Sequence, residues 1–110
     1  MKRIYLFLLL ICCASLVEAQ KIKVACVGNS VTFGYGLANP AEDAYPAQLQ
    51  KLLGEGYEVG NFGKSGATLL SKGHRPYILQ KEFEDAKAFA VYLVVIHLGL
   101  NDTGPRNWPN

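Results

Sequence analysis

The length, composition and charge of the chain limit what it can be. Its 110 residues allow one domain at most, because single domains usually contain about 100–200 residues. The 11 Lys and Arg residues and the 9 Asp and Glu residues give a net charge of +2 and are scattered along the sequence. This distribution excludes the basic stripe of a nucleic-acid-binding protein and the like-charge block of a disordered tail.

The first 19 residues have the layout of a secretory signal peptide. Lys2 and Arg3 form a basic start, an apolar run covers residues 4–17, and small Ala19 offers a cleavage site. The apolar run is shorter than the roughly 20 residues that a membrane-spanning helix needs. We therefore expect residues 1–19 to be removed on export and residues 20–110 to reach the periplasm or the extracellular space, with no stable membrane span.

The cysteines fit this interpretation. Cys12 and Cys13 would leave with the signal peptide, and neither follows the small residue that a lipid-anchoring signal prefers. Cys26 would then be the one cysteine of the mature chain, so no internal disulfide is expected. Because Cys26 lies in an apolar segment, we expect a buried structural thiol.

The first predicted element of the mature chain is a β-strand over residues 21–27. Its apolar residues are nearly continuous, as in a strand that is covered on both faces, and Gly28 ends it. Residues 29–40 are predicted to form a loop, since they contain the turn formers Asn29, Gly34, Gly36 and Asn39.

A short helix and a second strand follow. Pro46 is predicted to open the helix and Gly54 to close it, with one apolar stripe formed by Tyr45, Leu49, Leu52 and Leu53. Residues 57–62 are predicted to form a second, weaker strand.

The last predicted elements are a helix and a very hydrophobic strand. The helix is marked by helical spacing of the apolar residues Leu79, Phe83, Ala86 and Ala90. The strand covers residues 91–98 (VYLVVIHL), and Gly99 ends it.

The alternation of strands and helices predicts an α/β fold. Strands joined through helices lie parallel with right-handed crossovers, which gives a three-layer, doubly wound parallel sheet. In such sheets ligands bind outside the carboxyl ends of the strands. Three segments follow strand ends here and combine glycine with polar side chains: residues 28–30, 61–63 and 99–102.

These three segments contain the groups that an ester hydrolase needs. Ser30 offers a hydroxyl nucleophile and its own backbone N–H, Gly63 an unobstructed N–H, and Asn101 a side-chain amide. All three are expected at one edge of the sheet, so they can act on one substrate.

The same segments resemble the conserved blocks of the SGNH (GDSL-like) hydrolases. Residues 28–36 (GNSVTFGYG) resemble the first block, Gly63 with its neighbours the second, and residues 99–102 (GLND) match the Gly-x-Asn-Asp of the third. The resemblance implies a nucleophilic Ser30, with an oxyanion hole formed by the N–H groups of Ser30 and Gly63 and by the amide of Asn101. It also implies a flavodoxin-like SGNH domain of which residues 20–110 are the N-terminal part, with the first three strands.

The chain is also similar to bacterial proteins labelled sialate O-acetylesterases or GDSL-like lipase-acylhydrolases, which remove acyl groups from sugars or lipids. Two departures from the family pattern stand out. Asn29 replaces the usual Asp of the first block but keeps an acceptor oxygen. The fourth block, Asp-x-x-His, which supplies the base and its orienting carboxylate, is absent from the 110 residues.

Neither histidine of the chain is expected to replace the missing base. His97 lies within the third strand, roughly 13 Å back from Asn101 at about 3.3 Å per residue, and is predicted to be a hydrogen-bonded core residue. His74 is expected in a loop, exposed to solvent or in a binding role.

Other motif matches are incomplete. Residues 63–65 (GKS) imitate the end of a phosphate-binding P-loop, but Glu58 occupies the position of its first glycine. Residues 34–36 (GYG) begin a dinucleotide fingerprint, but Asn39 replaces the third glycine. Residues 101–103 form a glycosylation sequon, and modification there would remove the amide of the proposed site.

The sequence therefore predicts a carboxylic ester hydrolase that forms an acyl-enzyme on Ser30. No cofactor and no metal are expected, because the histidines and Cys26 lack metal-ligand spacing. The expected partner is a small-molecule ester, an acylated sugar or lipid, and the oligomeric state is left open. The alternatives are a lysophospholipase or thioesterase and, because the Asp-x-x-His block is absent, a catalytically dead carbohydrate-binding remnant. We expect the 110 residues alone to be a poor esterase.

The signal-peptide interpretation makes a direct prediction. Cleavage after Ala19 should give a mature chain that starts at Gln20, because the basic start and the short apolar run end at that small residue. Amino-terminal sequencing of exported material checks it. A start at Met1 would indicate an uncleaved anchor, and a start at Cys12 or Cys13 a lipoprotein.

Overall fold

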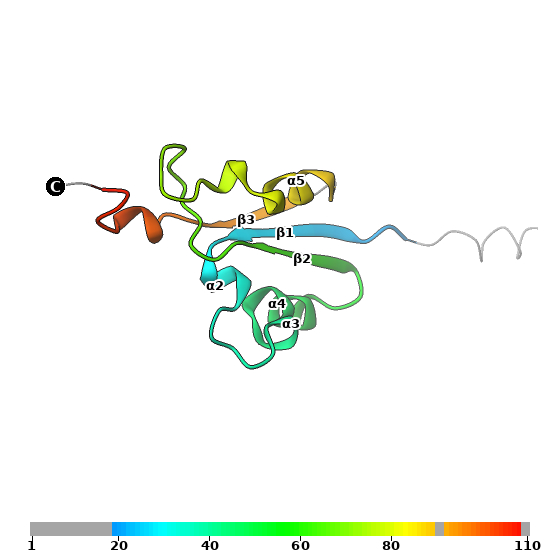
Figure 1. The fold of residues 1–110 in the computed structure, drawn as a ribbon. Coiled ribbons are helices and arrows are strands. Elements are labelled where there is room, and N and C mark those ends of the chain that lie inside the picture. The colour runs from blue at the N-terminus through cyan, green and yellow to red at the C-terminus, as the bar shows by residue number, and fades with distance from the viewer. Residues whose placement is uncertain (1–18, 90–91, 109–110) are drawn as a thin grey trace, which may run out of the picture.

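The computed structural model describes residues 19–89 and 92–108 and contains one parallel sheet. Its strands are β1 (Ile22–Gly28), β2 (Tyr57–Gly63) and β3 (Leu93–His97), in the order β2-β1-β3. Gly28 pairs with Gly63 on one side and with His97 on the other. The three strands therefore end together, as Figure 1 shows, and the predicted parallel sheet is confirmed.

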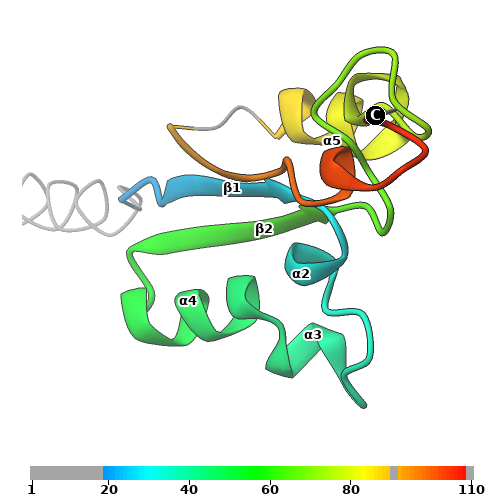
Figure 2. The ribbon, with the colours of Figure 1, turned by 90° about the vertical axis from the view of Figure 1, so that its left-hand side faces the viewer.

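Helices cover both faces of this sheet. One face carries α2 (Ser30–Phe33), α3 (Pro40–Asp43) and α4 (Tyr45–Leu53), and the other carries α5 (Lys81–Ala88) (Figures 1 and 2). Two 3-10 helices, η1 (Tyr77–Leu79) and η2 (Asn101–Thr103), lie in the loops after β2 and β3. The predicted three-layer α/β architecture is thus confirmed for the part of the chain that the structure describes.

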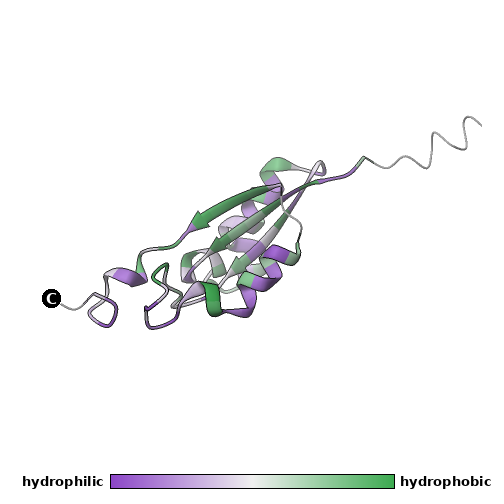
Figure 3. Cartoon of the chain, turned by 90° about the horizontal axis from the view of Figure 1, so that it is seen from above, coloured by the Kyte–Doolittle hydropathy of each residue, from purple (hydrophilic) through white to green (hydrophobic). Residues whose placement is uncertain are grey.

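The core is centred on β1, because in the described part of the chain β1 is the strand that has a neighbour on each side. Val24, Ala25 and Cys26 are at most 1% exposed, as the continuous apolar run predicts, and Cys26 is a free, buried thiol. Under α5, Val27 packs with Ala67, Tyr77 and Ala86. Figure 3 shows hydrophobic residues concentrated in the strands and hydrophilic residues on the helices and loops.

Two helical segments were missed by the sequence prediction, which gave a loop over residues 29–40. The helix α2 begins because the Asn29 side-chain oxygen accepts a hydrogen bond from the Val31 N–H at 3.0 Å, and it ends at Gly34, whose φ is +91°. The helix α3 begins at Pro40, a residue whose fixed φ suits the first turn of a helix.

For α4 and α5, the predicted ends of the helices agree with the structure better than the predicted buried faces do. Gly54 follows α4 as expected, but Leu52 is 85% exposed and does not belong to its buried face. Leu79 lies in η1 rather than in α5 and is also exposed. Ala90 and Val91 lie outside the described residues, and so do residues 1–18 of the predicted signal peptide.

The prediction of a core histidine at position 97 is wrong for this structure. His97 is exposed, because among the described residues β3 has β1 as its one neighbouring strand. The backbone carbonyl of His97 accepts a hydrogen bond from the Asn29 N–H at 3.3 Å, whereas its ring makes no hydrogen bond to a described residue. Within residues 19–89 and 92–108, no helix has the length and apolarity to cross a membrane.

The close contact of α2 with the sheet requires glycine at position 28. A Cβ atom there would lie 2.0 Å from Thr32 Oγ1 and 2.8 Å from the backbone oxygen of His97. We expect Gly28→Ala to lower the free energy of unfolding by about 1–3 kcal/mol, the usual cost of overpacking. Urea unfolding checks it, with Gly56→Ala as the control, because a Cβ at Gly56 meets nothing within 4 Å. Equal midpoints for the two variants would contradict the contact.

Candidate active site

Ser30 lies directly after β1, as the first residue of α2. It is half-buried, and its hydroxyl makes no hydrogen bond to a described residue, so the oxygen is available to a substrate. Its own N–H lies at the start of the helix, where backbone N–H groups have no partner within the helix. The preceding Asn29 is fully buried and fixes this turn through its bonds to Val31 and to the backbone of His97.

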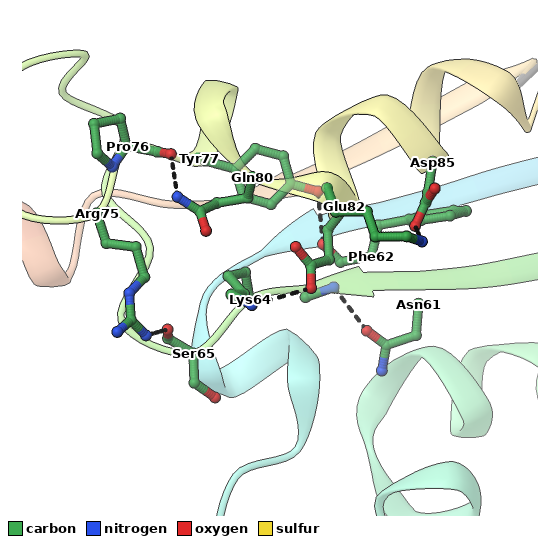
Figure 4. A network of polar contacts seen from close by, with 12 residues as sticks. Asn61, Phe62, Lys64, Ser65, Arg75, Pro76, Tyr77, Gln80, Glu82 and Asp85 are labelled. Atoms are coloured by element: carbon green, nitrogen blue, oxygen red, sulfur yellow. Dashed lines mark hydrogen bonds and ion pairs between the residues drawn. The ribbon is translucent and has the colours of Figure 1, made fainter.

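Gly63 lies at the end of β2, against the helix that Ser30 begins. A Cβ on Gly63 would be 2.2 Å from the Phe33 backbone nitrogen, so the strand end and α2 touch through their backbones. The Gly63 N–H donates to the Asn61 side-chain oxygen at 2.9 Å (Figure 4). The Asn61 amide in turn donates to the Thr32 carbonyl at 2.8 Å. The structure therefore places Gly63 close to α2, but its N–H is already occupied by Asn61.

The turn after Gly63 holds a second glycine, Gly66, that the sequence analysis did not select. The Ala67 N–H donates to the Lys64 carbonyl at 3.0 Å and closes a four-residue turn in which Gly66 has a φ of +79°. A turn with positive φ at its third residue favours glycine, and this is the sequence signal that could have identified the position. The Gly66 N–H makes no hydrogen bond to a described residue, so it remains available as a donor.

Polar contacts hold this turn in place (Figure 4). Arg75 Nη1 donates to the Ser65 carbonyl at 2.8 Å, and Lys64 pairs with Glu82 of α5 at 3.3 Å. The Tyr77 hydroxyl donates to the Phe62 carbonyl at 2.6 Å, and burial, with the nearby Glu82 carboxylate, raises the pKa of Tyr77 to about 12. The Tyr77 hydroxyl is therefore a neutral donor that anchors the end of β2.

Asn101 brings the loop after β3 to the loop after β2. Its side-chain Nδ2 donates to the Ala67 carbonyl at 2.9 Å, and its backbone carbonyl accepts from Asn107 Nδ2 at 2.7 Å. Because an amide nitrogen carries two hydrogens, one remains free after the bond to Ala67. The next residue, Asp102, is buried, and the backbone N–H groups of Leu69 and Leu70 donate to its carboxylate.

The two histidines lie in other contacts. His74 is exposed, its N–H donates to the Asn107 side chain, and its Nε2 accepts from Arg106 Nη1 at 3.1 Å. Neither the His74 ring nor the His97 ring is hydrogen-bonded to Ser30. The structure thus brings Ser30, the turn 64–67 and Asn101 to the carboxyl end of the sheet without pairing Ser30 with a histidine of the described residues.

Comparison with known proteins agrees with this arrangement. The sequence profile described as GDSL-like Lipase/Acylhydrolase family matches residues 26–110. The chain is 53% identical over 91 residues to an acetylxylan esterase of Xylanibacter ruminicola, an alignment that covers 83% of the chain and 19% of that protein.

Solved structures of esterases also resemble this chain. The chain resembles AlinE4, an esterase of the SGNH-hydrolase family, and a mutant of that esterase, with a TM-score of 0.61 and 27% identity over 78% of this chain and 44% of the esterase. The chain spans less than half the length of the relatives it matches. With its profile match and its sheet topology, the chain belongs to the GDSL-like lipase/acylhydrolase family and has the α/β fold of the SGNH hydrolases.

Proposed function

We propose that the protein that contains this chain is a serine esterase that removes acetyl or other short acyl groups from a carbohydrate. The observation that supports this proposal is that three parallel strands end together and are followed by Ser30, by the turn that holds Gly66 and by Asn101. Among the described residues the Ser30 hydroxyl has no hydrogen-bond partner, and one hydrogen of the Asn101 amide is not used in its bond to Ala67. The 53% identity to an acetylxylan esterase supports the carbohydrate ester as substrate.

In the proposed reaction the Ser30 oxygen attacks the ester carbonyl carbon while a base takes the hydroxyl proton. The electrons of the carbonyl π bond move onto the oxygen and form an oxyanion. The C=O bond then re-forms and the bond to the sugar oxygen breaks, and the sugar alkoxide takes the proton that the base had accepted. The acyl group is now an ester of Ser30. A water molecule attacks this ester in the same way and releases the free acid and the Ser30 hydroxyl.

The oxyanion needs N–H donors that are not already engaged. We assign two of them to the Ser30 N–H and to the second hydrogen of the Asn101 amide. Gly63 was expected to supply the third, but its N–H donates to Asn61. Gly66, in the turn that follows, is the better donor of this loop, because its N–H has no hydrogen-bond partner among the described residues.

The base is assigned to a part of the protein beyond these residues. His74 Nε2 already accepts from Arg106, and the resemblance to the family implies a histidine in an Asp-x-x-His block. The relatives that match are longer than this chain and have room for such a block.

A polysaccharide ester also agrees with the expected signal peptide, because polymeric substrates are met outside the cytoplasm. The alternatives are a sialate-type O-acetyl sugar, a longer acyl chain as in a lysophospholipase, and binding without catalysis. A panel of acetylated xylan, O-acetyl sialic acid and long-chain esters separates them. Turnover of acetylated xylan with little hydrolysis of the long-chain esters is the expected result.

The role of Ser30 makes a sharp prediction. In the full-length gene product, Ser30→Ala should abolish turnover, because no other group forms the acyl-enzyme. Ser71→Ala removes an exposed loop serine and serves as the matched control. Retained activity in Ser30→Ala would show that the nucleophile is wrongly assigned.

Asn101→Ala, measured on the same protein, should lower kcat by about 10²–10³, the usual loss for one oxyanion donor. Asn39→Ala is its control, because Asn39 is exposed and its side chain makes no capping hydrogen bond. A change confined to KM would remove Asn101 from the transition state.

A further inference from the structure

The carboxylate of Asp102 ties the loop after β3 to the loop after β2. The Leu69 N–H donates to Oδ2 at 3.0 Å, and the Leu70 N–H donates to Oδ1 at 2.7 Å. Asp102 is only 8% exposed, although it lies in a loop. Both carboxylate oxygens therefore bind backbone groups that are more than 30 residues away in the sequence.

Segment 67–70, which Asp102 contacts, is also hydrogen-bonded to residues 75–77. Thr68 is fully buried, its N–H donates to the Arg75 carbonyl at 2.8 Å, and its carbonyl accepts from the Tyr77 N–H at 2.9 Å. Tyr77 in turn packs in the core under α5. Segment 67–70 is thus tied to the core, and the loop after β3 is held in place by its bonds to this segment.

The loop after β3 needs such a support. The helix η2 has three residues, and its internal bonds are long: 3.2 Å from the Asp102 N–H to Gly99 and 3.4 Å from the Thr103 N–H to Leu100. Its neighbour Leu100 is 60% exposed, so little apolar packing holds this loop. Near its start, this loop is bonded to the loop after β2 through Asp102 and Asn101, which contact segment 67–70. Further along, Arg106 and Asn107 bond to His74.

We propose that Asp102 is a positioning residue of the esterase site, which sets the Asn101 amide by holding η2 on the backbone of segment 67–70. This inference rests on the proposed function. One amide hydrogen of Asn101 is donated to the Ala67 carbonyl. A shift of η2 would therefore turn the second hydrogen away from the oxyanion.

The chemistry of the side chain explains why an aspartate is needed. A carboxylate offers an acceptor to each of the two N–H groups, and a charged acceptor makes the stronger bonds. Asp102→Asn has nearly the same shape but places an NH2 group against one of the two backbone N–H groups. This variant therefore removes the positioning with little change in volume.

Steady-state kinetics of the full-length gene product test the inference. We expect Asp102→Asn to lower kcat by about 10-fold to 100-fold with little change in KM, a loss below that for removing an oxyanion donor itself. The double variant with Asn101→Ala should lose no more than Asn101→Ala alone, because Asp102 acts through Asn101. Asp85→Asn, at an exposed carboxylate paired with Lys81, is the control and should keep wild-type kcat.

Three results would overturn the inference: wild-type kcat in Asp102→Asn, a loss confined to KM, or a loss that adds fully to that of Asn101→Ala. If Asp102→Asn does not fold, hydrogen exchange of the wild-type protein tests whether Asp102 holds the backbone of Leu69 and Leu70. The Leu69 and Leu70 amides should be protected although both side chains are exposed, and free exchange would contradict the proposal. Failure of the proposed function appears separately, as activity that survives Ser30→Ala or Asn101→Ala.

Discussion

The pairing of Gly28 with Gly63 and with His97 sets the level at which all three strands stop. Because the strands are parallel, each chain segment that follows emerges on the same side of the sheet. Ser30, the turn 64–67 and Asn101 lie in these segments. The site is thus a consequence of the register, and a shift of one residue in either pairing would separate its parts.

Close backbone contact then fixes the distance between the parts. The helix α2 lies so near the sheet that a methyl group at either Gly28 or Gly63 would collide with it. Asn61 adds one hydrogen bond between β2 and α2, and Asn29 adds one between the turn before α2 and β3. The serine is therefore held by strands on both sides of β1, whereas Asn101 depends on hydrogen bonds between loops.

Features that depend on periodicity could be predicted from the sequence. The buried β1, the bounds of α4 and the parallel order of the strands follow from apolar runs, from Pro46 and Gly54, and from the alternation of strands with helices. The three strand-end segments followed in the same way. The short helix α2 was missed because a side-chain cap at Asn29, and not a repeating apolar pattern, starts it.

Features that depend on individual hydrogen bonds could not be predicted. The Gly63 N–H was expected to be free, but the side chain two residues earlier occupies it, which no spacing rule reveals. The partners of Asp102 are backbone groups of Leu69 and Leu70, and backbone groups carry no sequence signal. Among the described residues β3 is an outer strand with β1 as its one neighbour, and this leaves His97 exposed. The hydrophobic sequence of β3 does not by itself indicate that position.

The proposed reaction requires Ser30 to be the activated serine of the protein. Covalent labelling of the full-length gene product with a fluorophosphonate, which reacts with activated serines, tests this assignment. Peptide mass spectrometry should find one adduct, on Ser30, and an excess of the acetylated carbohydrate should slow its formation. Labelling at another residue, or an active esterase that takes up no label at Ser30, would show that Ser30 is not the nucleophile.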